Sequence, residues 1–250
     1  MSSEKGIAER ATRNALKIMK NAGFEISDKL RVEVDPKLVF MGYSTKRGGS
    51  DVIVVSGMSL RSGMVETLLI HEMCHVYRTN TNHPSHNNEL LNRVGQFIMR
   101  RSHLTEDYQV AVVQQAVNHI QDLYADDVAF RVLSQTETFP LDQAFSFFLS
   151  WINDKPVGSK NAKSVWLNIG IMLNNCFALS NMIRHNIPDV DKQAESKIQK
   201  FLSQTNERMK REFAYFQDFM INLREKTTEK EFEEDLTNYL TKITALADCS

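Results

Sequence analysis

Cysteine is scarce in this chain of 250 residues. Its three cysteines, Cys74, Cys176 and Cys249, form an odd set without the spacing of a disulfide framework. Domains that are stapled by disulfides carry a denser and even set, so the sequence argues against that class and favours a reducing compartment such as the cytoplasm. Cys74 stands three residues after His71, an offset that predicts a packing role rather than a metal ligand.

Neither charge nor apolar sequence is concentrated in any one segment. The formal net charge is -1 and no basic block is present, which argues against nucleic-acid binding through a strong electrostatic footprint. The N-terminal residues lack the apolar stretch of a secretory signal, and we expect none. The most apolar window, 165–183, predicts no membrane span because it is interrupted by residues that are costly in lipid, namely Asn168, Asn174, Asn175 and Asn181.

The remaining composition is that of an ordinary soluble globular protein, with 42% hydrophobic and 24% charged residues. Its length is sufficient for one large domain, or for a catalytic domain and a smaller one. The periodicity of apolar residues predicts an α+β fold that is predominantly helical, with a small N-terminal β-sheet. The expected strands are 30–34, 38–43 and 51–56, and the expected helices are 5–22, 62–79, 87–102, 105–134, 141–152, 162–184, 189–225 and 229–247.

A polar stretch, 153–161, contains both proline and glycine and is the best candidate for a linker. It divides the chain into a domain of residues 1–153, which holds the strands, and an all-helical domain of residues 162–250. An apolar stripe on the second domain favours packing against neighbouring helices, and a surface for a protein partner or for self-association is the alternative. The stripe consists of Ile198, Leu202, Thr205, Met209, Phe213, Phe216, Met220 and Leu223.

The segment His71-Glu72-Met73-Cys74-His75 has the pattern H-E-x-x-H within a predicted helix. Positions i and i+4 lie one turn apart on the same helix face, so His71 and His75 can bind one metal ion. Glu72 lies beside them, where a carboxylate can take a proton from a metal-activated water. The motif therefore predicts a catalytic metal centre, because purely structural zinc sites are usually closed by cysteines.

A catalytic zinc ion usually has three protein ligands and one open position, so a third ligand is expected elsewhere in the chain. The helix predicted over 105–134 offers Asp122, which shares a polar stripe with His119 and Asp126. Carboxylates at the edge of a buried face are costly unless they are paired or bind a metal. We therefore expect Asp122 to be the third ligand, and the alternatives are His86, His119 and Glu89.

Together, these segments resemble the gluzincin branch of the zincin metallopeptidases. In that branch H-E-x-x-H is followed by a helix with E-x-x-A-D/N, whose glutamate is the third zinc ligand and whose last residue supports a ligating histidine. The present sequence has Asp122-Leu123-Tyr124-Ala125-Asp126, so the register matches and aspartate replaces glutamate. The resemblance implies a Zn²⁺ ion held by His71, His75 and Asp122. The shorter side chain of aspartate requires this helix to approach the ion more closely.

A second resemblance is to SprT-like small zincins, in which a later histidine opens the next helix. His86 fits that register, with apolar residues four, five and eight positions after it, and would then be the third ligand. The metzincin pattern does not fit, because Arg78 and Thr81 stand where it has glycine and histidine. The resemblances cover about residues 50–135, and the chain as a whole looks like an archaeal zincin-like protein.

The resemblances imply a zinc metallopeptidase that hydrolyses peptide bonds in a peptide or protein substrate. In this hypothesis Glu72 accepts a proton from the water and passes it to the leaving amine. Asp126 orients His71 or His75 through the ring nitrogen that does not bind the metal.

Two further expectations rest on the analogy with this fold. An extended substrate is expected to add to strand 51–56 as an edge of the sheet. A side chain that supports the transition state is also expected, and the candidates are His119, Tyr124 and Tyr77. The alternative function is an interaction or scaffold protein on a zincin frame, with or without metal, in which the helices of 162–250 bind a partner.

Overall fold

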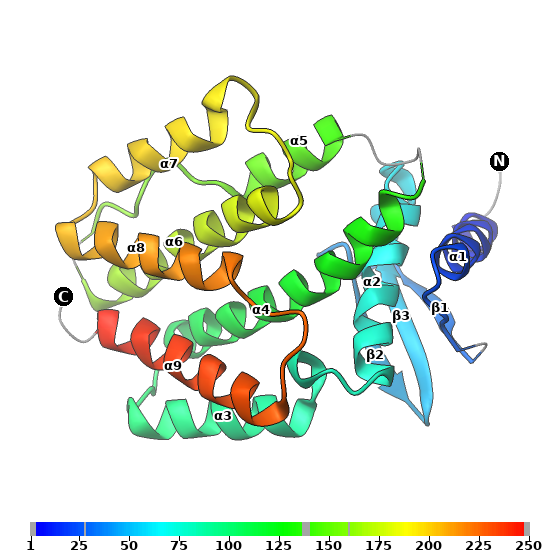
Figure 1. Cartoon of the computed structure of the whole chain (residues 1–250), viewed down its shortest axis with the longest axis horizontal. Coiled ribbons are helices and arrows are strands. Elements are labelled where there is room, and N and C mark those ends of the chain that lie inside the picture. The colour runs from blue at the N-terminus through cyan, green and yellow to red at the C-terminus, as the bar shows by residue number, and fades with distance from the viewer. Residues whose placement is uncertain (1–3, 28, 137–140, 160, 248–250) are drawn as a thin grey trace. The chain divides into compact units, whose positions relative to one another are not determined.

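The computed structural model describes residues 4–27, 29–136, 141–159 and 161–247, and these form nine α-helices and one three-stranded sheet (Figure 1). The chain is therefore predominantly helical with a small N-terminal sheet, as predicted. The elements are α1 (Glu4–Asn21), β1 (Arg31–Asp35), β2 (Gly42–Arg47), β3 (Ser50–Ser56), α2 (Val65–Asn80), α3 (Asn88–Arg101), α4 (Asp107–Leu133), α5 (Leu141–Trp151), α6 (Ala162–Arg184), α7 (Gln193–Ser203), α8 (Glu207–Ile221) and α9 (Glu229–Ala247).

The chain forms two compact units, each built from two stretches of sequence. The first consists of Met1–His83 and Tyr124–Phe139, and the second of Pro84–Leu123 and Pro140–Ser250. Helix α4 is continuous and contributes its first part to the second unit and its last part to the first. Compact units are defined by contacts and not by independent folding, so the predicted division into 1–153 and 162–250 stays a prediction. None of the described helices combines the length and apolar character needed to cross a membrane.

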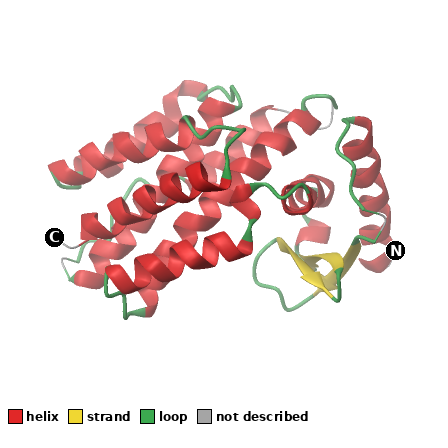
Figure 2. Ribbon diagram, turned by 60° about the horizontal axis from the view of Figure 1, so that its bottom comes forward, coloured by secondary structure: helices red, strands yellow, loops and turns green. Residues whose placement is uncertain are grey.

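The sheet of the first unit, yellow in Figure 2, has the strand order β1-β3-β2. Strand β3 pairs in parallel with β1 and antiparallel with β2, so both of its edges are occupied. The expectation that strand 51–56 offers a free edge to a substrate is therefore wrong. Its run Val52–Val55 is apolar at every position, which is the pattern of a strand buried on both faces rather than of one at an exposed edge.

The second strand begins later than the predicted 38–43, because β2 starts at Gly42. Its place is set by pairing, in which Gly42 lies opposite Val55. A Cβ at Gly42 would lie 2.9 Å from the carbonyl oxygen of Val54, so only glycine fits this close approach without a shift. Val39 has the composition of a strand residue but is 87% exposed in the preceding loop, where it pairs with no strand.

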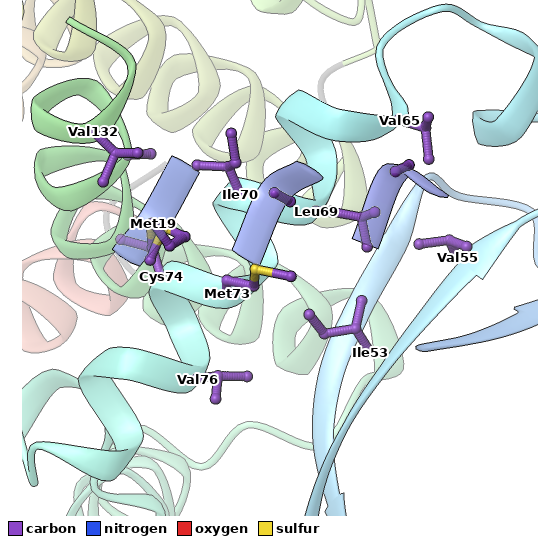
Figure 3. Close-up of a cluster of buried hydrophobic side chains, with 14 of the residues drawn as sticks. Met19, Ile53, Val55, Val65, Leu69, Ile70, Met73, Cys74, Val76 and Val132 are labelled. Atoms are coloured by element: carbon purple, nitrogen blue, oxygen red, sulfur yellow. The ribbon is translucent and has the colours of Figure 1, made fainter. Parts of the chain in front are cut away.

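A continuous apolar core in the first unit fixes α2 in place (Figure 3). Met19 of α1, Ile53 and Val55 of β3 and Val132 of α4 surround the buried side of α2. That side of α2 is formed by Val65, Leu69, Ile70, Met73, Cys74 and Val76. Burial of so many side chains along one helix holds the backbone rigidly, which is what a site built on that helix requires.

The second unit is entirely helical among its described residues, and its predicted 189–225 helix is in fact two helices, α7 and α8. The chain turns at 204–206, where the side chain of Asn206 accepts a hydrogen bond from the backbone N–H of Met209 and caps α8. The apolar stripe is largely core, as predicted, because Ile198, Phe213 and Met220 are buried.

Helices α6 and α8 are joined by a ladder of side-chain to backbone hydrogen bonds. Cys176, Ser180 and Arg184, spaced one turn apart on α6, donate to the carbonyl oxygens of Phe213, Gln217 and Ile221. Each donor and acceptor are 37 residues apart, so the rungs share one register. Arg184 extends the last rung, because it also donates to the carbonyl oxygens of Met220 and Leu223. These carbonyls lie in the last turn of α8 or just after it, where no following helical turn supplies backbone N–H groups.

Candidate metal centre

Helix α2 presents the two histidines of the H-E-x-x-H segment on one side. Their imidazole planes stand at 78°, and the Nε2 atoms of His71 and His75 lie 3.1 Å apart. Both side chains are half-buried, in contrast to the apolar residues on the opposite side of the helix. The spacing of one helical turn therefore brings two nitrogens to one point at the surface of the core.

Asp126 of α4 holds His71 from the other side of its ring. The carboxylate is buried, and its Oδ1 lies 2.9 Å from Nδ1 of His71. An ionised carboxylate only accepts hydrogen bonds, so Nδ1 carries the proton and Nε2 keeps its lone pair. A lone pair directed at the ring nitrogen of His75 is the arrangement in which a cation can bind both histidines.

Asp122 lies one helical turn before Asp126 on the continuous helix α4. His71, His75 and Asp122 each offer one ligand atom, and these three atoms lie within 4.8 Å of one another. Two nitrogens bound at 2.0–2.1 Å to a tetrahedral zinc ion are roughly 3.3 Å apart, close to the separation of the two Nε2 atoms. The spacing and the His₂Asp donor set both fit zinc with one position left open.

Glu72 is only 6% exposed, although it is charged and lies next to a ligand candidate. Among the residues that the structure describes, no hydrogen-bond donor or cation is paired with its carboxylate. Its oxygens are not among the described buried atoms that lack a hydrogen-bond partner, so the carboxylate keeps contact with solvent. This position has the lone pairs that a proton acceptor needs.

Cys74 is part of the core and not of the ligand cluster. Its side chain is fully buried among the apolar residues of the first unit. Burial, and secondarily the charge of Asp126, raises the pKa of the thiol well above its ordinary value. The group therefore stays a neutral thiol, whereas a zinc ligand must be a thiolate.

The other proposed third ligands lie outside this cluster. His86 is buried in the second unit, and its Nδ1 is 2.8 Å from Oγ of its neighbour Ser85. Glu89 is exposed in the first turn of α3. Within the described part of the chain, the potential metal ligands that come together are His71, His75 and Asp122.

His119 lies in an aromatic cluster of the second unit. It is 2% exposed and stacks on Phe177 with ring centroids 4.6 Å apart, and Trp151 lies at its edge. Burial lowers the pKa of His119 to about 4, against the opposing charge of Asp122, so the ring is neutral at neutral pH. Among the described residues, His119 is not one of those whose ligand atoms converge.

The two tyrosines proposed as transition-state groups are packed against other rings. Tyr124 is buried, with the ring of His83 4.7 Å away. Tyr77 points to the core of the first unit and meets Phe24 edge-on. Neither hydroxyl is placed by these contacts at the histidine pair.

One residue near the cluster is not among those proposed from the sequence. Arg78 is 4% exposed, and its Nε donates to the carbonyl oxygen of Tyr124 over 2.9 Å. The available signal was its position: it follows His71 by seven residues and His75 by three, which places a charged residue on the helix face of the metal ligands.

Asp126→Asn is expected to weaken zinc binding by about 10–100-fold, the usual effect of changing the partner of a ligating histidine. The neutral amide accepts from Nδ1 more weakly than the carboxylate does, and its NH₂ group can donate to Nδ1 instead, which would place the ring proton on the Nε2 that the metal needs. The measurement is a competition titration of metal-free protein against a fluorescent zinc chelator. Asp127→Asn, the same change at the next position, is the matched control and should bind zinc like the unmodified chain. Unchanged affinity in Asp126→Asn would contradict the role of Asp126.

Comparison with known proteins identifies one family. A protein-family model described as a family of unknown function, DUF5781, matches residues 15–245. No curated protein and no solved structure matches the chain.

Proposed function

The chain belongs to the DUF5781 family, a family of unknown function, and we propose that it is a zinc-dependent metallopeptidase of the zincin type. The proposal is supported above all by one observation: His71, His75 and Asp122 come together with their ligand atoms within 4.8 Å of one another. A structural zinc site would need only a closed set of ligands and has no use for a carboxylate such as that of Glu72 next to a ligand.

Three residues are assigned to metal binding. His71 and His75 provide Nε2 atoms, and Asp122 provides a carboxylate oxygen. Asp126 keeps the proton of His71 on Nδ1, so that Nε2 is available. Zinc bound by these groups supplies Lewis-acid chemistry, since it lowers the pKa of water towards neutrality and polarises a carbonyl group.

Glu72 is assigned to proton transfer. Its carboxylate accepts the proton that the attacking water loses as the new C–O bond forms. It then delivers that proton to the amine that leaves as the C–N bond of the peptide breaks. The water is thus divided between the new carboxyl and amino termini, and Glu72 returns to its starting state.

The substrate is a peptide or protein, and the proposal gives no substrate contact to the aromatic residues that were considered. His119 and Tyr124 are almost completely buried, and Tyr77 packs against Phe24. We assign these side chains to packing. Strand β3 is likewise given no substrate, because both of its edges are paired within the sheet.

The proposal is tested by metal content and hydrolysis on the same preparation. Elemental mass spectrometry of untagged protein purified without chelators is expected to find about one zinc ion per chain. Incubation with a peptide library is expected to generate new termini, detected by mass spectrometry. This activity should be lost with 1,10-phenanthroline and restored by added zinc. Protein that takes up no zinc even when incubated with it would contradict the proposal and favour an interaction protein.

A further inference from the structure

We infer that Arg78 is a positioning residue of the metal centre, which holds α4 against α2 so that Asp122 stays in reach of the metal. This inference rests on the proposed zinc site. Arg78 acts through the backbone of α4, to which its Nε donates at Tyr124.

The location of Arg78 on α2 is the first observation. His71, His75 and Arg78 follow one another at successive turns on the same helix face. The Arg78 side chain is 4% exposed, and its guanidinium lies over the ring of Tyr124, 5.9 Å from the centroid. The helix therefore carries a buried cation directly beyond its two histidines.

The partner of Arg78 is the second observation. Its Nε donates to the carbonyl oxygen of Tyr124, which stands in the sequence midway between Asp122 and Asp126. A backbone acceptor moves only if the helix moves, so this bond fixes the main chain of α4. The fixed point lies within the helical turn that carries both Asp122 and Asp126.

Together with the bond between Asp126 and His71, the bond from Arg78 gives α4 two attachments to α2 on either side of His75. With the bond of Asp126 alone, the turn of α4 that carries Asp122 is held by one polar contact and by core packing such as that of Val132. The second bond, at Tyr124, further limits a pivot of this turn relative to the histidines. Zinc–ligand distances vary by only about 0.2 Å, so such a pivot would lower the affinity of the site for zinc.

The choice of arginine is the third observation. A buried guanidinium is costly compared with an apolar side chain of similar volume, so packing alone does not account for it. Its planar donors have fixed directions, which lets the group donate to a carbonyl and lie over a ring in one conformation. Both contacts are made to the same residue, Tyr124.

The test compares zinc affinity with stability in Arg78→Met, which keeps the bulk of the chain and removes the donor. By competition titration its zinc dissociation constant is expected to rise by about 10–100-fold. With cobalt(II) in place of zinc, its visible spectrum is expected to change, because the absorption reports the number and geometry of the ligands. The melting temperature of the metal-free protein is measured in parallel.

Arg184→Met is the matched control. Arg184 also donates to main-chain carbonyls, at the end of α8, but it belongs to the all-helical unit and not to the cluster. Its loss is expected to lower the melting temperature and to leave zinc affinity and the cobalt spectrum unchanged. If Arg78→Met does not fold, Arg78→Gln replaces it, because its amide is too short to reach as the guanidinium does.

The outcomes separate the two proposals. Zinc in the unmodified chain with the same affinity and cobalt spectrum in the Arg78 variant overturns the role of Arg78 and leaves the zinc site intact. Equal loss of affinity in the Arg184 variant also overturns it, since general destabilisation would then explain the effect. No zinc in the unmodified chain overturns both. Weaker binding confined to the Arg78 variant supports the inference.

Discussion

Replacing Glu72 with glutamine is expected to lower kcat/KM for peptide hydrolysis by about 10²–10⁴-fold, because general base catalysis contributes that much. The amide has nearly the shape of the carboxylate but cannot accept the proton of the attacking water. Zinc content should stay at that of the unmodified chain, since Glu72 is not among the convergent ligand atoms. The measurement is a progress curve on the best peptide from the library, normalised to bound zinc.

The same change at Glu66 provides the control, because Glu66 lies on the same helix but is not among the convergent ligand residues. Its Oε1 accepts a hydrogen bond from the side-chain amide of Asn14, and glutamine can still accept it. Glu66→Gln should keep full activity. Full activity in Glu72→Gln would refute the role of Glu72 and would leave a zinc-binding protein with a different catalytic base or with none.

Removing a ligand is expected to abolish zinc binding altogether. His71→Ala and Asp122→Ala should each reduce bound zinc from about one ion per chain to background after dialysis, because the remaining two ligands hold the ion too weakly. Elemental mass spectrometry measures this directly, and circular dichroism checks that each variant is folded.

Asp127→Ala is the appropriate control for Asp122→Ala, because Asp127 lies on the same helix but not in the cluster. It should keep its zinc. If zinc is lost in His71→Ala but kept in Asp122→Ala, Asp122 is not the third ligand. Attention would then return to His86, which in this structure is hydrogen-bonded to Ser85.

The helices could be predicted from sequence because their signals are local. Residues 62–79 and α2 nearly coincide, and 162–184 coincides with α6. The errors arose where local preference competes with pairing. Val39 and its neighbours have high strand propensity, but β2 is defined by its partner β3, and propensity in strands depends on such partners. The central position of β3 depends on β1, some 20 residues away, and no local pattern encodes it.

The predictability of the site divides in the same way. The spacing of His71 and His75 is set by one helical turn, so the sequence states it directly. Their meeting with Asp122 depends on how two helices approach, and there the sequence offered several candidates. Arg78 was overlooked because a charged residue in a helix is normally exposed. Its burial against Tyr124 appears only once α4 is in place.

The ladder of hydrogen bonds between α6 and α8 restricts substitutions in the two helices unequally. Its acceptors are carbonyl groups, which every residue possesses, so substitutions in α8 cannot remove them. Its donors are particular side chains, and α6 cannot exchange Cys176, Ser180 or Arg184 without losing a rung. Changes of length are tolerated in the turn at 204–206, but a residue inserted between rungs would put the following donors or acceptors out of phase. Substitutions in α6 should therefore disrupt the contact between these helices more often than substitutions in α8.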